Sequence, residues 1–290
     1  MKLAMKNRRA RLAAVALLLS TLLFAIVPAS DSKRTDTTRF PFEPTEELVY
    51  EGEFTRAILR GINIAELRFN VNQTQFSSTT QTKGGAQPAL RFTVEVESKG
   101  LLLKLFGLSF HQHVESTVEP SSFGVLQTTK LDEQGKRKRT SVAVFDKAAG
   151  KVTWTERDPN NPSREPRVVT SRMSGAVQDI ASAFYYLRTQ PLAVGKSFEM
   201  LVSDAGQIYH IPITVSEKTR MKTVLGEVQT LRVEPDVFGE GRLLRGKGKI
   251  SIWLTDDARH IPVRAHINNE MGTLDIKLKS MTGNNINERR

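Results

Sequence analysis

The stretch Leu90-Arg91-Phe92-Thr93-Val94-Glu95-Val96-Glu97 alternates an apolar residue with a polar one at every position. Successive side chains of a β-strand point to opposite faces, so this alternation predicts a strand with one buried and one solvated face. Antiparallel sheets commonly have one face of each kind. The stretch therefore favours an antiparallel β fold.

The same period of two recurs along most of the chain. Turn sequences such as Glu119-Pro120 and Gln134-Gly135 separate the segments. The predicted strands cover 48–55, 62–69, 90–97, 110–118, 123–130, 137–145, 150–156, 196–202, 207–216, 225–234, 246–254, 261–269 and 272–279. Many short strands at this spacing predict a mainly β protein, built as a sandwich, a barrel or a strongly curved antiparallel sheet.

Besides the apolar segment 101–108, described below, two further segments lack the alternation. One has apolar residues at intervals of three and four, which predicts a short helix at about 175–189, ended by Pro191. Its apolar face comprises Val177, Ile180, Ala181, Phe184 and Leu187. We expect this helix to plug an open side of the sheet. The other segment, 157–172, is polar and rich in proline, and is predicted as a long surface loop.

The N-terminus has the parts of a secretory signal peptide. Basic residues precede an apolar run from Leu12 to Val27, and Val27-Pro28-Ala29 offers small residues at its first and last positions. Cleavage after residue 29 removes five basic residues and no acidic one, so the formal net charge falls from +11 to +6. We expect a periplasmic protein; the alternative is an uncleaved segment that tethers it to the inner membrane. The apolar run is short for a span of about 20 residues.

The composition narrows the classes of function. The chain has no Cys, which excludes disulfides, thiol catalysis, thiolate metal sites and a lipid attached through cysteine. A mildly basic mature protein suits an anionic surface such as lipid head groups, although excess Lys and Arg also serve solubility. Nucleic acid is a poor partner for an exported chain.

We divide the chain into a signal peptide (1–29), a polar linker with two prolines (30–46), a single β domain (47–280) and a polar tail (281–290). Within the domain, the segment 101–108 is apolar on all sides apart from one lysine. It is either a buried strand or core loop, or an apolar flap over a ligand cavity or against lipid. Candidate ligand-binding residues are Leu101, Leu102, Leu103, Leu105, Phe106 and Leu108 in this segment, and Ile180 and Phe184 in the closing helix.

Two short motifs could carry chemistry. His111-Gln112-His113 puts two imidazoles on one side of a strand, a spacing that some zinc sites use, but the sequence gives no convergent third ligand. Asp256-Asp257, followed by Arg259 and His260, offers an acid–base group, but Asp is also a common turn former. We predict a solvent-facing histidine pair without a metal, and a hairpin turn.

The basic run Lys136-Arg137-Lys138-Arg139 either contacts anionic head groups or protects a solvated sheet edge. Nucleophile, metalloprotease and nucleotide-binding motifs are missing from the sequence. We therefore predict no enzymatic activity and no cofactor. The alternative is a metal- or carboxylate-dependent hydrolase that uses His111, His113, Asp256 or Asp257.

Three regions together resemble one family. They are Glu47–Gly52 with Gly61–Leu67, then Asp179–Arg188, and then Ile252–Arg264 with Gly272-Thr273-Leu274. This pattern is similar to the bacterial exported domain-of-unknown-function family 3108, from about Phe40 to Lys279. The resemblance implies a curved antiparallel sheet, analogous to the half-barrels of periplasmic lipoprotein and lipid carriers, and brings no catalytic residues. It also suggests that Arg264 pairs with Asp256 or Asp257.

Two functions follow as hypotheses. In the first, the curved sheet holds a lipid or another hydrophobic envelope molecule on an apolar concave side, closed by the helix and by segment 101–108. In the second, the sheet is packed solid and serves as an envelope scaffold that binds a protein partner through a strand edge or its basic residues.

Overall fold

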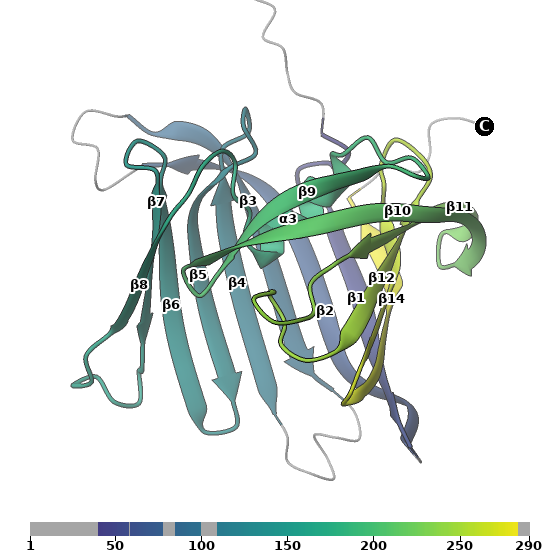
Figure 1. Ribbon diagram of the computed structural model, residues 1–290, viewed down its shortest axis with the longest axis horizontal. Helices are drawn as coiled ribbons and strands as arrows, with labels where there is room; N and C mark the ends of the chain where they lie inside the picture. The colour runs from purple at the N-terminus through teal and green to yellow at the C-terminus, as the bar shows by residue number, and fades with distance from the viewer. Residues whose placement is uncertain (1–39, 58, 78–84, 100–108, 284–290) are drawn as a thin grey trace, which may run out of the picture. The chain divides into compact units, whose positions relative to one another are not determined.

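The computed structural model describes residues 40–57, 59–77, 85–99 and 109–283. This part of the chain forms one antiparallel sheet of fourteen strands, in the order β8-β7-β6-β5-β4-β3-β2-β1-β14-β13-β12-β11-β10-β9 (Figure 1). The sheet curves around helix α3 (Ile180–Arg188) and is not closed into a barrel. The predicted fold class, a strongly curved antiparallel sheet with one short helix, is confirmed.

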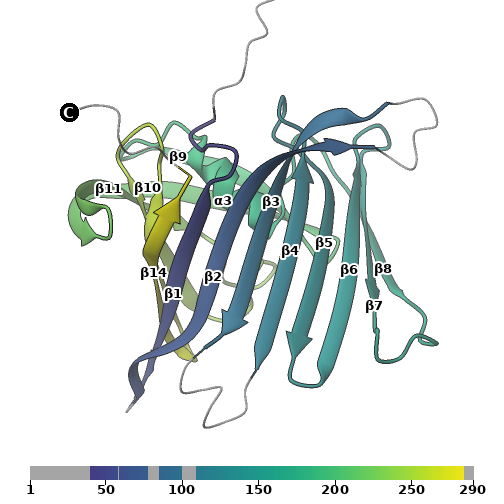
Figure 2. The same cartoon turned by 180° about the vertical axis from the view of Figure 1, so that it is seen from behind.

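The strands are β1 (Glu47–Arg56), β2 (Leu59–Phe76), β3 (Gln87–Ser98), β4 (Phe110–Val118), β5 (Val125–Gln134), β6 (Arg137–Asp146), β7 (Lys151–Arg157), β8 (Arg167–Arg172), β9 (Ser197–Asp204), β10 (Gln207–Thr223), β11 (Gly226–Pro235), β12 (Gly248–Thr255), β13 (Pro262–Asn269) and β14 (Gly272–Thr282). Strands β1 to β8 form one meander, seen from behind in Figure 2, and β9 to β14 form a second. Pairing of β1 with β14 joins the two meanders.

The alternation in the sequence determines which face of the sheet is buried. In β3, Leu90, Phe92 and Val94 are buried, whereas the residues between them are partly solvated. Strand β4 pairs apolar with apolar at this face, with Val118 opposite Leu90 and Val114 opposite Val94. The buried residues therefore collect on the side of the sheet that faces α3.

Aromatic side chains fill the space between the helix and the first meander. Tyr185 of α3 stacks on Phe92 of β3 with ring centroids 4.2 Å apart, and Phe42 meets Tyr185 edge-on at 5.2 Å. Phe42 is only 5% exposed, and Glu46 is fully buried. Phe42 and Glu46 therefore belong to the core, although residues 43–45 between them are exposed. Our prediction of a linker as far as residue 46 was wrong for these two residues.

Two element boundaries differ from the sequence-based prediction. Helix α3 begins at Ile180 and not at 175, because Gln178 is extended and hydrogen-bonds along β9. The backbone N–H of Gln178 donates to Leu201 at 2.8 Å, and that of Ser203 donates to Gln178 at 2.7 Å. Residues 167–172, predicted as part of a loop, form β8, whose two faces are both largely exposed.

Several predicted segments lie outside the described residues. These are the signal peptide, the linker up to residue 39, the apolar segment 101–108 with its six candidate residues, and the tail from residue 284. Within the described residues, no helix has the length and apolarity to cross a membrane.

The turn between β9 and β10 brings the two ends of the sheet together. Ala205 and Gly206 both have positive φ, 47° and 77°, as expected for a two-residue hairpin turn. A Cβ on Gly206 would lie 2.8 Å from Trp154 Cβ on β7 and 2.9 Å from Val169 Cβ on β8. The turn therefore packs tightly against the far edge of the sheet.

Candidate ligand cavity

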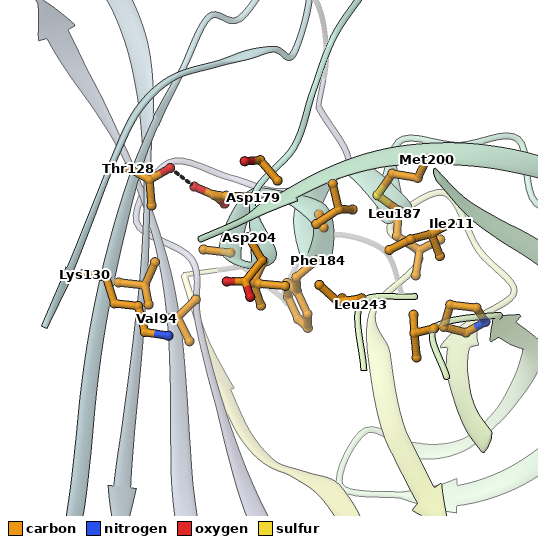
Figure 3. Close-up of a pocket in the computed structure, with 18 of the residues that line it drawn as sticks. Val94, Thr128, Lys130, Asp179, Phe184, Leu187, Met200, Asp204, Ile211 and Leu243 are labelled. Carbon is orange, nitrogen blue, oxygen red and sulfur yellow. Dashed lines mark hydrogen bonds between the residues drawn. The ribbon is translucent and has the colours of Figure 1, made fainter. Parts of the chain in front are cut away.

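The concave side of the sheet encloses a cavity of about 500 Å³ (Figure 3). One wall comes from β2 to β7, another from β9 to β12, and α3 contributes a third. A nine-residue helix is about 13 Å long, which is short compared with the strands that surround it. The helix therefore fills only part of the concave side.

The walls are apolar because one side of each alternating strand faces inward. Val94 and Val96 of β3 line the cavity, whereas Glu95 between them contacts the histidines on the outer face. Ile211 and Ile213 of β10 follow the same rule. The pattern that predicted half-buried strands thus also produces a mostly apolar lining.

The N-terminus of α3 is fixed by one carboxylate. Asp179 accepts the backbone N–H of Ser182 at 2.7 Å, and the Ser182 hydroxyl accepts the backbone N–H of Asp179 at 2.9 Å, which completes a capping box. The same carboxylate accepts the hydroxyls of Ser116 on β4 and Thr128 on β5. Asp179 therefore caps the helix and ties it to the sheet.

The C-terminus of α3 is fixed by a buried ion pair. The guanidinium of Arg188 binds the carboxylate of Glu46, with Nη2 3.0 Å from Oε2, and both side chains are fully buried. Arg188 also donates to the carbonyl oxygens of Pro41 at 3.0 Å and Arg259 at 3.1 Å. The position of the helix in the cavity is thereby determined at both ends.

The cavity has a polar end and an apolar end. Figure 3 places Lys130 and Asp204 on one side of Phe184, and Leu187, Met200 and Ile211 on the other. The remaining polar lining residues are Gln112, Thr128, Ser141, Asp179 and Ser203. The cavity is thus apolar over most of its lining, and two charged side chains lie on one side of Phe184, with apolar Val94 between them in this view.

The two candidate residues of the helix both line this cavity. Phe184 stacks on Phe69 of β2 with ring centroids 4.1 Å apart. Ile180 is 53% exposed, which places it where the cavity opens to solvent. Sequence reasoning missed Lys130 and Asp204; the available signal was a lysine on the same face of its strand as inward-facing Thr128.

The histidine pair lies on the outer face of the sheet and meets a shared carboxylate. Both His111 and His113 contact Glu95, and Nδ1 of His111 lies 3.1 Å from Glu133 Oε2. Ligand atoms of Glu95, Glu97 and His111 lie within 4.8 Å of one another, close enough to hold a metal ion. Sequence reasoning did not find Glu95 because it lies on the neighbouring strand.

The carboxylates of this outer cluster affect its histidine. Hydrogen bonds to Glu95 and then to Glu133 raise the pKa of His111 above its ordinary value. Burial raises the pKa of Glu95, but hydrogen bonds from His111 and His113 outweigh it and leave that pKa below its ordinary value. The cluster therefore favours a charged imidazole between charged carboxylates.

The Asp256-Asp257 motif forms the predicted turn between β12 and β13. Asp257 accepts the Thr255 hydroxyl at 2.8 Å and the Arg259 backbone N–H at 3.0 Å. Asp256 pairs with Lys218, and Nδ1 of His260 lies 2.9 Å from the carbonyl oxygen of Arg188. The groups are thus occupied by structural contacts and do not converge on a common point.

For charged residues, the structure corrects the expected partner of Arg264 and excludes the sheet-edge alternative for the basic run. Arg264 pairs with Asp275 at 2.7 Å and not with Asp256 or Asp257, because β14 lies beside β13. The basic run 136–139 enters β6, which pairs with β5 and β7 and is not an edge strand. Three of its residues form ion pairs, Arg137 with Asp132, Lys138 with Glu133 and Arg139 with Asp158.

Residues 50–279 match the family model described as "Protein of unknown function (DUF3108)". Among solved structures, a β-barrel-like DUF1849 protein from Brucella abortus aligns with a TM-score of 0.52 at 10% identity, covering 83% of this chain and 98% of the other. An exported protein with a YmcC-like fold from Bacteroides fragilis covers 84% and 98%, at 7% identity and a TM-score of 0.29. No curated protein matches this chain. The first alignment shows that the two proteins share a fold, whereas the second is too weak for a comparison of folds.

Proposed function

This chain belongs to the DUF3108 family of proteins of unknown function, and from its cavity we propose that it is an exported, non-enzymatic protein that binds a lipid or another hydrophobic envelope molecule. One observation carries the proposal: the concave side of the sheet, which packing could have filled, holds an apolar cavity of about 500 Å³.

The size and lining of the cavity suit a small hydrophobic ligand. Cavities that bind small molecules are typically about 300–1,000 Å³ and mostly apolar, with a few polar groups that orient the ligand. Apolar surface gains about 25 cal/mol for each Å² removed from water, so a hydrocarbon chain in this space is stabilised along its length. The polar groups at one end supply the orienting contacts.

The proposal that the protein is exported rests on the sequence of its N-terminus. A basic head, a short apolar run and small residues at the exit are features of a secretory signal peptide. Hydrophobic molecules that must cross the aqueous periplasm need a protein that shields them from water. An exported protein with an apolar cavity meets that need.

The direct test is native mass spectrometry of the exported protein. The full-length precursor is expressed in a bacterium and the exported form is purified without detergent. We expect a chain that lacks residues 1–29 and carries an additional mass of lipid size. A bare chain that remains bare after incubation with envelope lipid extract would contradict the proposal.

One observation favours a second candidate, the envelope scaffold. Strand β8 lies at the edge of the sheet, and among the described residues no strand pairs with its outer side. Its Val168 is 58% exposed. An open edge can bind an extended segment of a partner by adding a strand. Cross-linking in cells from a photoreactive residue at position 168 tests this candidate, and recovery of no envelope protein would count against it.

A further inference from the structure

We propose that the cavity selects amphiphiles with a zwitterionic head group, in which Lys130 contacts the anionic group and Asp204 contacts the cationic group. This inference rests on the proposed function and specifies its ligand class. It starts from the two charged side chains at the polar end of the cavity, one on β5 and one on β9.

The two charges face the cavity from different walls. Both side chains are half-buried and both line the cavity, and Figure 3 shows them on the same side of Phe184. They come from different meanders of the sheet, which the curvature brings together. A bound molecule at this end would therefore meet one positive and one negative group.

Among the described residues, neither charge has an ion-pair or hydrogen-bond partner on its side chain. Nearby charges do have partners, since Arg137 binds Asp132 and Lys138 binds Glu133 at 2.7 and 2.8 Å. A charge that is partly removed from water without a partner is unfavourable, and an opposite charge on a ligand removes that cost. The polar end is thus complementary to a head group that carries both signs.

A neighbouring hydroxyl supports the assignment of the anionic group to Lys130. Ser141 of β6 lies directly opposite Lys130 in the register of the sheet, and both residues line the cavity. A hydroxyl and an ammonium group both donate hydrogen bonds to phosphate oxygens. Asp204 is only an acceptor when ionised, so it suits the ammonium group of the same ligand.

The apolar end of the cavity determines which way the acyl chain of a bound lipid would lie. Leu187, Met200 and Ile211 lie across Phe184 from the two charges in Figure 3. A head group at Lys130 and Asp204 would direct an acyl chain past Phe184 toward these residues. The ligand class is therefore a lipid with a phosphate and an amine in its head group and at least one acyl chain.

The experiment compares three single-chain lipids with the same acyl chain on delipidated, exported protein. Lysophosphatidylethanolamine carries both charges, lysophosphatidylglycerol carries only the phosphate, and monoacylglycerol carries neither. Affinities are measured by isothermal titration calorimetry. Because charge-assisted contacts are worth more than neutral ones but are weakened by partial exposure, we expect the zwitterionic lipid to bind about 5- to 10-fold more tightly than lysophosphatidylglycerol. The two charge contacts multiply against the uncharged lipid, so the zwitterionic lipid should bind about 25- to 100-fold more tightly than monoacylglycerol.

Two variants assign the roles. Lys130→Met is expected to weaken both phospholipids by about 5- to 10-fold and to leave monoacylglycerol unchanged. Asp204→Asn is expected to abolish the preference for the amine. The matched control is Lys138→Met, which removes a lysine on the adjacent strand that pairs with Glu133 on the outer face; its affinities should equal those of the wild type.

The outcomes separate this inference from the proposed function. Equal binding of the three lipids, unaffected by both variants, would overturn the inference and leave the hydrophobic cavity as a binding site. If the wild type binds lysophosphatidylglycerol more tightly than lysophosphatidylethanolamine, Asp204 does not have the proposed role. If none of the lipids binds, both the inference and the proposed function fail.

Discussion

Arg188 has the largest fully buried side chain among the described residues, and its role in holding α3 can be tested directly. Removing one partner of a buried ion pair leaves the other charge buried and uncompensated. We expect Arg188→Met to lower the free energy of unfolding by about 3–5 kcal/mol, measured by urea denaturation. The loss should include the hydrogen bonds to Pro41 and Arg259 at the end of α3.

The matched control is Arg259→Met, which removes a cation from a half-exposed pair with Asp257. Exposed pairs contribute about 0–1 kcal/mol, so this variant should unfold almost like the wild type. The double variant Glu46→Gln, Arg188→Met should be more stable than the sum of the single effects, since neither buried charge is left alone. Wild-type stability of Arg188→Met would show that the pair does not hold the helix.

His111 on the outer face gives a prediction about pH. Its pKa is raised chiefly by Glu95 and then by Glu133. The folded protein therefore holds the imidazole proton more tightly than the unfolded chain does. The resulting stabilisation is fully present below the unfolded pKa of about 6.5 and is lost as pH rises through the raised folded pKa.

The measurement is the Tm of wild type and His111→Gln across pH. The lowered pKa of Glu95 contributes stability at pH values above the ordinary pKa of this carboxyl. The Tm of the wild type should therefore exceed that of the variant most between about pH 5 and 6. The difference should disappear by about pH 9. Glu97, His113 and Lys138, which lies 2.8 Å from Glu133, share the cluster and are unchanged in both proteins. A constant difference from pH 5 to 9 would contradict this account.

At the residue scale, the sequence predicted side-chain direction but not side-chain partners. Alternation correctly puts His111 and His113 on one face, and helical spacing correctly puts Ile180 and Phe184 on another. Glu95, the carboxylate that both histidines contact, depends on the register between β3 and β4. That register is set by the pairing of two strands and cannot be read from either one alone.

At the scale of the element, the turn between β9 and β10 is tightly constrained by its neighbours. Gly206 has φ +77° and lies against Trp154 and Val169, so an alanine there meets both backbone strain and a clash. Positive φ costs a non-glycine residue about 1–2 kcal/mol, and overpacking adds about 1–3 kcal/mol. We expect Gly206→Ala to lower the free energy of unfolding by about 2–5 kcal/mol in urea denaturation.

Gly226 provides the comparison, because it has φ +90° and a Cβ there would have nothing within 4 Å. Gly226→Ala should therefore show only the cost of strain, about 1–2 kcal/mol. Equal effects of the two variants would contradict this prediction, because the clash with Trp154 and Val169 would then cost nothing.

The elements that the sequence failed to predict share a physical cause. Val177 fits the helical period, yet it accepts a backbone hydrogen bond from Val125 at 3.2 Å and so precedes the helix. Strand β8 lies at an edge with both faces largely solvated, and therefore lacks the alternation that revealed β3. In both places, contacts with distant strands decide a conformation that local periodicity leaves open.

At the scale of the whole described domain, the cavity depends on curvature. Lys130 and Asp204 lie on different meanders, and only the bending of the joined sheet around α3 places them at one end of one cavity. Alternation predicted an apolar concave side, but it does not specify how strongly a sheet bends. The cavity volume and its two charges could therefore not be predicted from the sequence.

A ligand in this cavity should stabilise the folded domain, since the unfolded chain has no cavity to bind it. At a free ligand concentration of 100 times Kd, the gain is about 2.7 kcal/mol. For a domain of this size we expect Tm to rise by roughly 5–10 °C, measured by thermal unfolding with and without lysophosphatidylethanolamine.

Filling the cavity with a larger side chain of the protein itself should remove this ligand-induced rise in Tm. Ala183 lines the cavity, so Ala183→Trp is expected to place its ring in the space that the acyl chain would fill. Val168→Trp adds the same ring on exposed β8 and should keep the full shift, which separates loss of the cavity from the general effect of an added aromatic. If Ala183→Trp folds and still shows the full rise in Tm, the ligand binds elsewhere, because one space cannot hold both the indole and the chain.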